Sequence, residues 1–236
     1  MIDVALTPRE LAPADVAVVI DVLRATSTAT QALAAGYRRV RFADTIERAR
    51  ALRADGRVLA GERHCVAPEG FDQGNSPADA AHCRGDELVL ATTNGAPAIV
   101  AAAAGAPRVV LACLLNLGAV IAELAAAPER VRIQIVCSGT DGAVALEDVY
   151  VAGRISAALA GDRTDAARVA EAVARAFPSA LAALEGSADA GSLRAAGMTS
   201  DVAYCAREST LDVVPAAIAA GPGVALAVGG GGAARR

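Results

Sequence analysis

The feature that most constrains the fold is a regular alternation between short apolar runs and longer alanine-rich segments. The apolar runs, rich in Val, Ile and Leu, lie at residues 16–20, 38–43, 57–61, 87–92, 108–113 and 131–137. The spacers have helical character near residues 27–36, 45–54, 94–104 and 116–127. Strands that are apolar on both faces need helices on both sides, and spacers of this length suit right-handed crossovers. The pattern predicts an α/β fold, layered α/β/α, with a mostly parallel or mixed sheet.

The pattern changes in the last third of the chain. Helical segments follow one another at residues 147–160, 164–176, 178–185 and 189–197, with one short strand expected near 211–215. No linker rich in Pro, Gly or Ser precedes them, so we expect an accessory layer or small subdomain. One domain is predicted over residues 1–229, with two intimate subdomains that meet near 145–150 as the alternative. The end GPGVALAVGGGGAARR is predicted to fray, and residues 230–236 to form a flexible tail.

Composition narrows the class of protein. The 236 residues carry a formal net charge of -4 with both signs interspersed, which leaves no broad basic face for a nucleic acid. Charges near the start, and apolar runs interrupted before about 18 residues, predict neither a secretory signal nor a membrane span. The five cysteines are odd in number and lack a C-x-x-C pair, which argues against a disulfide framework and a zinc site. A reducing cytoplasm is the expected location.

Polar residues gather directly after four of the apolar runs. The four segments are DVLRATST, GERHCVAPEGFDQGNSP, TTNGAP and SGTDGAVALED. Each one alone has a structural explanation, because a hydroxyl can cap a helix and Asn-Gly is a common turn. Ligands of open α/β sheets, however, bind outside the carboxyl ends of the strands, where such segments converge. Together the four segments predict one binding or catalytic site.

The side chains in these segments suit an anion that is held with a hard cation. Carboxylate ligands for Mg2+ are available from five acids, Asp21, Glu62, Asp72, Glu147 and Asp148. Arg24 and Arg63 are suited to grip a phosphate or another acid through paired hydrogen bonds. Helix starts after Ser27 and Asn94 would add free backbone N–H groups and a positive dipole end. Metal and anion donors together are the equipment for phosphoryl transfer to water.

Better-known hydrolase motifs do not match. Asp21 follows a strand as a haloacid-dehalogenase nucleophile does, but that motif needs a second acid where Leu23 stands. No G-x-S-x-G elbow occurs, and the two histidines lack metal-ligand spacing. His64 lies beside the acidic loop, where it is either a proton carrier or an ordinary loop residue. Cys113 and Cys137 fall in apolar runs and are expected in the core.

The same segments, taken in order, resemble those of the 2-phosphosulfolactate phosphatase family. The matching stretches are Asp21-Val22-Leu23-Arg24-Ala25-Thr26-Ser27-Thr28, Gly61-Glu62-Arg63, Gly70-Phe71-Asp72-Gln73-Gly74-Asn75-Ser76-Pro77, Thr92-Thr93-Asn94-Gly95, Asn116, Ser138-Gly139-Thr140 and Leu146-Glu147-Asp148. Asp201-Val202 with Cys205 resembles a later motif of the family. The likeness covers most of the chain, and the pair of GFDxGNSP and TTNG is specific.

The resemblance implies a magnesium-dependent hydrolase on a distinctive α/β fold, associated with coenzyme M and sulfolactate formation. The implied reaction removes phosphate from 2-phospho-3-sulfolactate and leaves 3-sulfolactate. Ala96 stands where the family has threonine after TTNG, Ser138 stands where alanine is common, and His64 and Cys65 follow the glutamate and arginine. These departures bear on the exact substrate more than on the phosphatase class.

The residues and the resemblance together assign roles in the site. The predicted catalytic residues are Asp21, Arg24, Arg63 and Asp148. The predicted metal ligands are Asp21, Glu62, Asp72 and Glu147. The predicted substrate-binding residues are Thr26, Ser27, Asn75, Thr93, Asn94, Gly95, Asn116, Ser138 and Thr140. Asp21 either attacks phosphorus or only binds the metal.

Three other functions stay open from the sequence. A metal-dependent phosphohydrolase of another small anionic ester would use the same residues. A non-enzymatic module for an anionic metabolite would need the arginines and helix ends but not five acids. A structural or interaction protein would leave the polar loops dispersed. The alanine-rich helices also suggest a possible homodimer.

Overall fold

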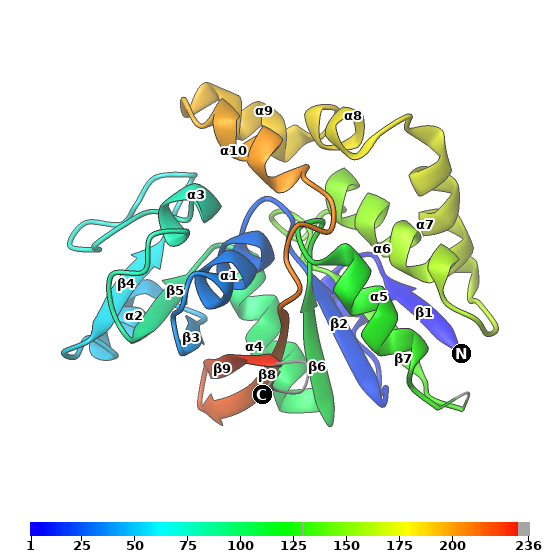
Figure 1. The fold of residues 1–236 in the computed structure, drawn as a ribbon, viewed down its shortest axis with the longest axis horizontal. Coiled ribbons are helices and arrows are strands. Elements are labelled where there is room, and N and C mark those ends of the chain that lie inside the picture. The colour runs from blue at the N-terminus through cyan, green and yellow to red at the C-terminus, as the bar shows by residue number, and fades with distance from the viewer. Residues whose placement is uncertain (129, 231–236) are drawn as a thin grey trace.

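The computed structural model describes residues 1–128 and 130–230, and a nine-stranded sheet lies at its centre (Figure 1). In spatial order the strands are β1-β7-β2-β6-β8-β9-β3-β5-β4. In chain order their bounds are β1 Ile2–Ala5, β2 Val16–Ile20, β3 Arg39–Ala43, β4 Arg57–Gly61, β5 Glu87–Ala91, β6 Arg108–Ala112, β7 Ile133–Cys137, β8 Val214–Gly221 and β9 Val224–Gly230. The predicted α/β class is confirmed.

The sheet consists of two parallel groups of strands joined by a hairpin. β1, β7, β2 and β6 run parallel to one another, and so do β3, β5 and β4. The β8–β9 hairpin lies between the groups and pairs antiparallel with β6 on one side and with β3 on the other. The mostly parallel sheet is confirmed, with an antiparallel hairpin at its middle.

Helices cover both faces of the sheet. They are the 3-10 helix η1 Pro8–Glu10 and the α-helices α1 Ala25–Ala34, α2 Ile46–Ala51, α3 Pro77–Ala80, α4 Gly95–Gly105, α5 Leu117–Ala125, α6 Leu146–Ala158, α7 Asp165–Ala176, α8 Ala180–Glu185, α9 Ala188–Ala195 and α10 Thr199–Cys205. α1 and α4 share one hydrophobic cluster with residues of both strand groups. α5, α6 and α7 cover the other face of the first group, and α2 covers the other face of the second. This is the predicted layered arrangement.

β2 illustrates why the apolar runs become central strands. Val16, Val18 and Ile20 belong to the cluster with α5, α6 and α7. Ala17 and Val19 belong to the cluster with α1 and α4. All five side chains are buried. Because side chains alternate between the faces of a strand, a strand covered on both sides requires an uninterrupted apolar run.

The carboxyl ends of the two strand groups converge. Three successive antiparallel pairings separate β6 from β3, so the groups run in opposite directions along the ladder. Gly95, which follows β5, nevertheless packs against Asp21, which follows β2. Two-stranded ribbons twist more than wide sheets, so the β8–β9 hairpin is where the ladder can turn enough to allow both observations. Polar segments from both groups therefore reach one place.

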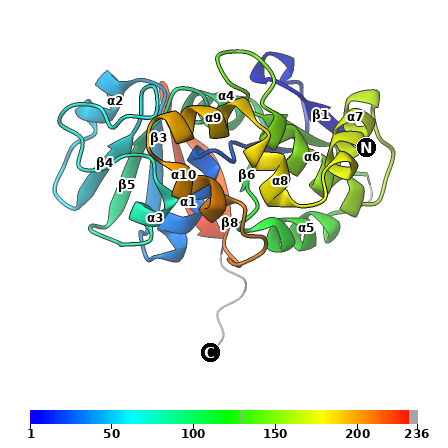
Figure 2. The same ribbon diagram turned by 90° about the horizontal axis from the view of Figure 1, so that it is seen from above.

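The helices after β7 form a layer in which α6 and α7 pack on the first strand group, while α9 and α10 lie above the strand ends, beside α1 and α3 (Figure 2). α6 and α7 approach closely because Gly153 faces the backbone of Ala170, where a Cβ would overlap the carbonyl oxygen. α8, α9 and α10 contribute Leu184, Leu193 and Val202 to the cluster that contains β2 and β7. The predicted accessory layer is confirmed, while the subdomain boundary near 145–150 stays a prediction.

The β8–β9 hairpin corrects one prediction. The sequence GPGVALAV is predicted to fray, but it forms the turn of the hairpin and most of β9. Ala225 and Ala227 of β9 are buried in the cluster with α1 and α4. Small side chains that look low in complexity here allow close packing between a strand and alanine-rich helices.

Element boundaries otherwise agree within a few residues. β8 extends the strand expected near 211–215 as far as Gly221. Gly230, which falls in the predicted tail, pairs with Val214, and residues 231–236 lie outside the described residues. β1, α3 and α10, each of four to seven residues, have no counterpart among the predicted elements. No helix in the described part of the chain is long and apolar enough to cross a membrane.

Candidate active site

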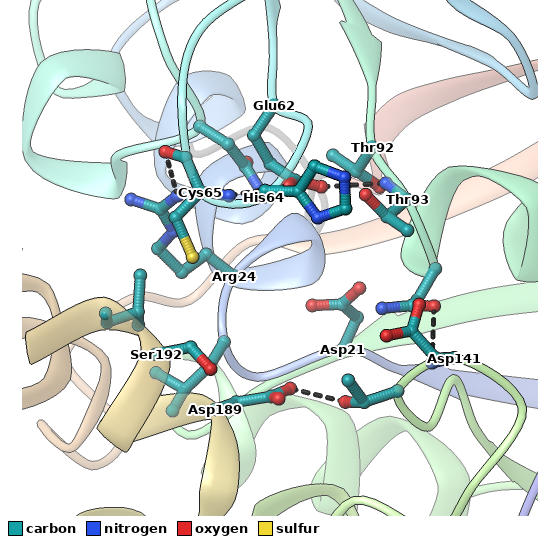
Figure 3. A pocket seen from close by; sticks show the side chains of 15 residues that line it. Asp21, Arg24, Glu62, His64, Cys65, Thr92, Thr93, Asp141, Asp189 and Ser192 are labelled. Atoms are coloured by element: carbon teal, nitrogen blue, oxygen red, sulfur yellow. Dashed lines mark hydrogen bonds between the residues drawn. The ribbon is translucent and has the colours of Figure 1, made fainter. Parts of the chain in front are cut away.

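Residues of all four polar segments line one pocket with a volume of about 140 Å³ (Figure 3). They follow β2, β4, β5 and β7, and α9 closes the pocket from the helical layer. The lining residues are Asp21, Leu23, Arg24, Glu62, His64, Cys65, Asn75, Thr92, Thr93, Asn94, Thr140, Asp141, Asp189, Ser192 and Leu193. Figure 3 shows Asp21 in the middle, between Glu62 and Asp189.

Asp21 is buried at the end of β2 and is fixed by its own loop. Its Oδ1 accepts a hydrogen bond from the N–H of Ala25 at 2.8 Å. The Thr26 hydroxyl donates to the Asp21 carbonyl at 2.7 Å and accepts from the Asp21 N–H at 3.1 Å. Burial raises the pKa of Asp21 to about 7, and the charges of Asp189 and Glu62 act in the same direction. Thr26, predicted to bind substrate, thus holds the Asp21 backbone.

Gly95, the first residue of α4, leaves room for the Asp21 carboxyl group. A Cβ at this position would overlap Oδ2 of Asp21 and the side chain of Ala25. Glycine at position 95 of the TTNG segment is therefore required by the approach of two strand ends. The predicted substrate-binding role of Gly95 reduces, in this geometry, to the space that it gives Asp21 and to its backbone N–H.

Arg24, three residues after Asp21, is almost completely buried. Its Nη1 donates to Oδ2 of Asp201 at 2.6 Å, and the two side chains are 2% and 5% exposed. Its Nη2 donates to the carbonyl of Cys65 at 3.5 Å. Arg24 also lines the pocket, so one guanidinium joins the pocket wall to α10.

Glu62 connects the loops after β4 and β5. Its Oε1 accepts from the N–H of Thr93 at 2.7 Å, and its Oε2 accepts from the N–H of Cys65 at 3.2 Å. Its carboxylate therefore orders two strand-end loops while it faces the pocket. His64 and Cys65 both have positive φ angles, 50° and 67°, and both line the pocket. Burial raises the pKa of the Cys65 thiol.

The two acids at the start of α6 lie behind the pocket wall. Asp148 accepts from the N–H of Val22 at 2.9 Å and from that of Gly139 at 3.1 Å, so it ties the loop after β2 to the loop after β7. Burial raises the pKa of Asp148. Burial also raises the pKa of Glu147 to about 8, and the charge of Asp189 adds to this effect. Neither acid is among the lining residues.

Asp189 is a pocket acid that the sequence analysis missed. It lies in the first turn of α9, and its Oδ2 accepts from the Thr140 hydroxyl at 2.6 Å. Its charge raises the pKa of both Asp21 and Glu147. No strand-end pattern marks it, because it lies in an alanine-rich helix of the last third of the chain.

A family model described as 2-phosphosulpholactate phosphatase matches residues 2–219. The chain belongs to the 2-phosphosulfolactate phosphatase family. The resemblance seen in the sequence is therefore confirmed.

Relatives of this family member include three proteins named probable 2-phosphosulfolactate phosphatase. The one from Deinococcus radiodurans is 43% identical over 85% of this chain and 87% of its own length. The one from Thermus thermophilus is 41% identical over 87% of this chain and 89% of its own. The one from Pseudothermotoga lettingae is 38% identical over 91% and 95%. The similarity thus extends over both strand groups and most of the helical layer.

Five polar side-chain atoms of the phosphosulfolactate phosphatase segments are buried without a hydrogen-bond partner among the described residues. They are Nε2 and Oε1 of Gln73, Oδ1 of Asn75, Oγ1 of Thr93 and Oγ of Ser138. Asn75 and Thr93 line the pocket, as do Asn94 and Thr140. Buried polar atoms normally have partners, so those of Asn75 and Thr93 are candidates for contacts with a ligand or ordered water.

Asp72 and Arg63 are among the predicted site residues of this family member that do not line the pocket. Asp72 accepts from the N–H of Leu59 at 2.7 Å and pairs with Arg53 at 3.3 Å, with its side chain 42% exposed. Arg63 turns back to the carbonyl of Glu62 at 2.7 Å. In this geometry Asp72 braces its own loop and the Arg63 guanidinium donates to a local carbonyl, so neither side chain lines the pocket. The metal-binding role of Asp72 and the catalytic role of Arg63 stay predictions.

Two predicted substrate-binding residues also serve the scaffold. The Ser27 hydroxyl donates to the carbonyl of Val22 at 2.8 Å, inside the turn that carries Asp21. Asn116 accepts from the N–H of Cys113 at 2.9 Å, and its amide donates to the carbonyl of Val213 at 3.0 Å. Neither lines the pocket. Short motifs thus include residues that shape the loops as well as residues that face a ligand.

The charge of the pocket bears on the implied magnesium ion. Four acids line it, Asp21, Glu62, Asp141 and Asp189, whereas the Arg24 charge is shared with Asp201. No three Asp, Glu, His or Cys side chains within residues 1–128 and 130–230 form a ready-made metal centre. Magnesium does not need one, because it commonly takes one or two carboxylates together with water and substrate phosphate oxygens. The acids of the pocket fit an ion that binds with an anionic substrate.

Proposed function

We propose that this chain is a magnesium-dependent phosphatase that hydrolyses 2-phospho-3-sulfolactate to 3-sulfolactate and inorganic phosphate. The observation that carries the proposal is the pocket in which Asp21, Glu62 and Arg24, all from segments that resemble family motifs, lie together with Asp189. The relatives named probable 2-phosphosulfolactate phosphatase support this substrate.

Asp21, Glu62 and Asp189 are the residues that we assign to magnesium. When bound, the ion supplies positive charge to the phosphate oxygens and polarises the phosphorus centre. Oδ1 of Asp21 is already fixed by the N–H of Ala25, and Gly95 leaves space beside Oδ2. An anionic ester would be repelled by four acids without such compensation, which is why the acids themselves support a cation.

The remaining polar groups suit the oxygens of the substrate. Arg24 would donate from Nη2 to the phosphate or to the acidic tail of the ester. Thr93 and Asn75 would gain partners for buried polar atoms. The N–H of Gly95 begins the eleven-residue helix α4, whose positive end favours an anion. These groups orient the ester and offset its charge, which is most of what phosphoryl transfer needs from a protein.

Asp21 has two possible roles in this reaction, and each has a distinct signature. As a nucleophile, its carboxylate attacks phosphorus, the ester P–O bond breaks, and water then hydrolyses the acyl phosphate. As a ligand only, Asp21 leaves the attack to water. A burst of the released alcohol, with an acyl phosphate trapped at Asp21, assigns the first role. Single-step hydrolysis without either signal assigns the second.

A phosphatase for a different small anionic ester is the second candidate function. It is favoured by His64 and Cys65, which depart from the expected sequence after Glu62-Arg63 and which line the pocket. A changed wall alters which ester fits more than it alters the phosphoryl chemistry, since Asp21 and Arg24 are retained.

A panel of phosphate esters tests the proposal. Phosphate release is measured from 2-phosphosulfolactate, phosphoglycolate and 2-phosphoglycerate, after EDTA treatment and again with added Mg2+. We expect the largest kcat/KM for 2-phosphosulfolactate and no turnover until Mg2+ is restored. A larger kcat/KM for another ester selects the second candidate. Zero turnover throughout, with phosphate binding retained in calorimetry, selects a non-enzymatic binding module.

The proposal includes a cytoplasmic location. All five cysteines are free, which is the usual state of thiols in a reducing compartment. Fractionation of the native host, followed by immunoblotting, checks the location. The possible homodimer stays a prediction, which light scattering of the purified chain tests.

A further inference from the structure

Arg24 is the one arginine among the described residues that line the pocket, and its guanidinium has two differently held ends. Nη1 donates to Oδ2 of Asp201 at 2.6 Å and lies 3.0 Å from Sδ of Met198. Within the described part of the chain, Nη2 makes a single long hydrogen bond, to the carbonyl of Cys65 at 3.5 Å. One end is therefore fixed by α10, and the other keeps capacity for a ligand.

Asp201 joins two of the motif segments through one carboxylate. While its Oδ2 holds Arg24, its Oδ1 accepts from the Ser76 hydroxyl at 2.7 Å. Ser76 precedes α3 and follows Asn75, which lines the pocket. Both oxygens of this buried acid are thus engaged, and they link the DVLR segment to the GFDQGNSP segment.

Stability alone is a weak explanation for this pair. Both side chains are at least 95% buried, and desolvation largely offsets the attraction between two buried charges. An apolar pair of similar volume would serve a packed core at least as well. Orientation is a stronger explanation, because a long arginine side chain loses its geometry without a fixed partner.

We propose that Asp201 is a positioning residue that holds Arg24 with Nη2 directed at the anionic group of the substrate. The inference rests on the proposed function and deepens it, because it assigns the helical layer a part in anion recognition. Asp201 itself need not touch the substrate. The residues that bind the anion come from the strand ends, and α10 sets the position of one of them.

The first experiment is a double-mutant cycle on kcat/KM, with the ester that the wild-type chain hydrolyses best. Asp201→Asn keeps the shape of the side chain but removes its charge, and it is expected to lower kcat/KM by about 100-fold. Arg24→Ala is expected to lower it by about 1,000-fold. Adding Asp201→Asn to Arg24→Ala should cost less than about threefold more, since the residue acts through Arg24.

Chemical rescue of Arg24→Ala by guanidinium ion depends on Asp201 only if Asp201 positions the guanidinium group. A merely structural role of Asp201 would not change the rescue. Guanidinium ion added to Arg24→Ala should occupy the vacated site beside Asp201 and restore part of the activity. The same ion should restore at least about tenfold less activity in the Arg24→Ala/Asp201→Asn double variant, because the anchoring carboxylate is gone. Equal rescue in both backgrounds would overturn the inference.

Two neighbouring variants serve as matched controls. Met198→Leu replaces the other Nη1 neighbour without removing a charge, and kcat/KM should stay within about threefold of wild type. Ser76→Ala removes the second bond of Asp201 but leaves Arg24 paired, and a loss of about threefold to tenfold is expected. A larger loss in Met198→Leu than in Asp201→Asn would contradict a role for the carboxylate.

The inference stays testable if one variant or the proposed activity fails. Should Asp201→Asn not fold, Asp201→Glu and Ser76→Ala carry the comparison, and unchanged kcat/KM in both overturns it. A wild-type chain that hydrolyses no ester refutes the proposed function instead. Inorganic phosphate then serves as the probe in calorimetry with Mg2+, where Asp201→Asn should raise the Kd for phosphate by about tenfold. Unchanged affinity would overturn the inference.

Discussion

Two acids of opposite character lie near the two ends of β5. At its start, Glu87 accepts hydrogen bonds from Arg41 at 2.6 Å, Arg57 at 2.9 Å and Arg39 at 3.0 Å. These arginines, Arg41 above all, lower the pKa of Glu87 to about 2. At the other end, the TTNG segment contacts Asp21. Burial raises the pKa of Asp21 to about 7.

The difference separates an acid that stabilises the fold from acids kept for a ligand. Glu87 is buried with its countercharges in place, so it is stable as an anion within the folded chain. Asp21 is buried among Glu62, Asp189 and Glu147, which oppose its ionisation or share its surroundings. Buried acids whose charged form is disfavoured in this way are characteristic of functional sites, where a cation or substrate completes the charge balance.

The largest change in kcat/KM is expected for a substitution of Asp21, the acid at the pocket end of β5. Asp21→Asn should lower kcat/KM by about 1,000-fold or more, because it removes a carboxylate from the centre of the pocket. The measurement is steady-state phosphate release with Mg2+ present. Asp55→Asn, at an exposed acid outside the pocket, should leave turnover unchanged. Full activity in Asp21→Asn would refute the site assignment.

Gly95→Ala sharpens the comparison without altering a charge. The new Cβ would displace the Asp21 carboxyl group or the start of α1, and we expect kcat/KM to fall by about 100-fold. Gly105→Ala, at the far end of α4, meets no atom within 4 Å and serves as the control. Equal activity of the two variants would show that the position of Asp21 does not depend on Gly95.

Glu87→Gln tests the acid at the start of β5, whose charge is balanced by three arginines. It removes the negative charge that three arginines share and replaces one acceptor oxygen with an amide donor, so the free energy of unfolding should fall by about 2 kcal/mol, with kcat/KM unchanged. Asp86→Asn is the matched control, because its 3.9 Å pair with Arg38 is largely exposed and should contribute less than about 0.5 kcal/mol. Urea denaturation measures both. A loss of activity without a loss of stability in Glu87→Gln would break the comparison.

The sequence predicted the scaffold better than it predicted the roles within the site. β2, β5 and β6 were recognisable because a strand buried on both faces needs an unbroken apolar run. The β8–β9 hairpin was not, since its alanines and glycines gain their meaning only from the helices packed against them.

Site residues show the same limit at finer scale. Asp72 lies three positions before Asn75, yet only Asn75 faces the pocket, because the side chain of Asp72 turns back to Leu59 and Arg53. Asp189 reaches the pocket only through the packing of α9, and no local pattern signals that packing. Motifs therefore locate the loops, while the tertiary fold decides which of their side chains face a ligand.

Asp21 and Glu147 should make the free energy of unfolding depend on pH in one direction, and Glu87 should make it depend on pH in the opposite direction. The folded pKa values of Asp21 and Glu147 are raised from 3.8 and 4.5 to about 7 and 8, so the folded state binds more protons in that interval. The free energy of unfolding must then fall as pH rises from about 4 to 8. Glu87 is lowered from 4.5 to about 2, so its contribution is present above pH 4.5 and lost as pH falls.

Thermal melts in EDTA from pH 3 to pH 8 measure these slopes, with a maximum of stability expected near pH 4 to 5. Asp21→Asn should flatten the limb above the maximum, and Glu87→Gln the limb below it. Each change is expected to be several degrees in Tm. An upper limb that keeps its slope in Asp21→Asn would mean that Asp21 ionises as readily in the folded chain as in the unfolded one.

The smallest expected effect concerns the turn at the pocket wall. Arg63 and Val66 exchange backbone hydrogen bonds of 2.9 and 3.0 Å, and the two residues between them, His64 and Cys65, both have positive φ. A two-residue hairpin turn of this geometry favours Asn-Gly. His64→Asn combined with Cys65→Gly should therefore raise the free energy of unfolding by about 1 kcal/mol.

The same double variant removes two side chains from the pocket wall while it leaves Asp21 and Arg24 in place. We expect the preference among the phosphate esters to change and the Mg2+ requirement to stay, because the wall selects the ester and the acids meet the cation. His82→Asn, at an exposed histidine outside the pocket, is the control for loss of an imidazole. A more stable variant with an unchanged ester preference would mean that the strained turn serves something other than substrate selection.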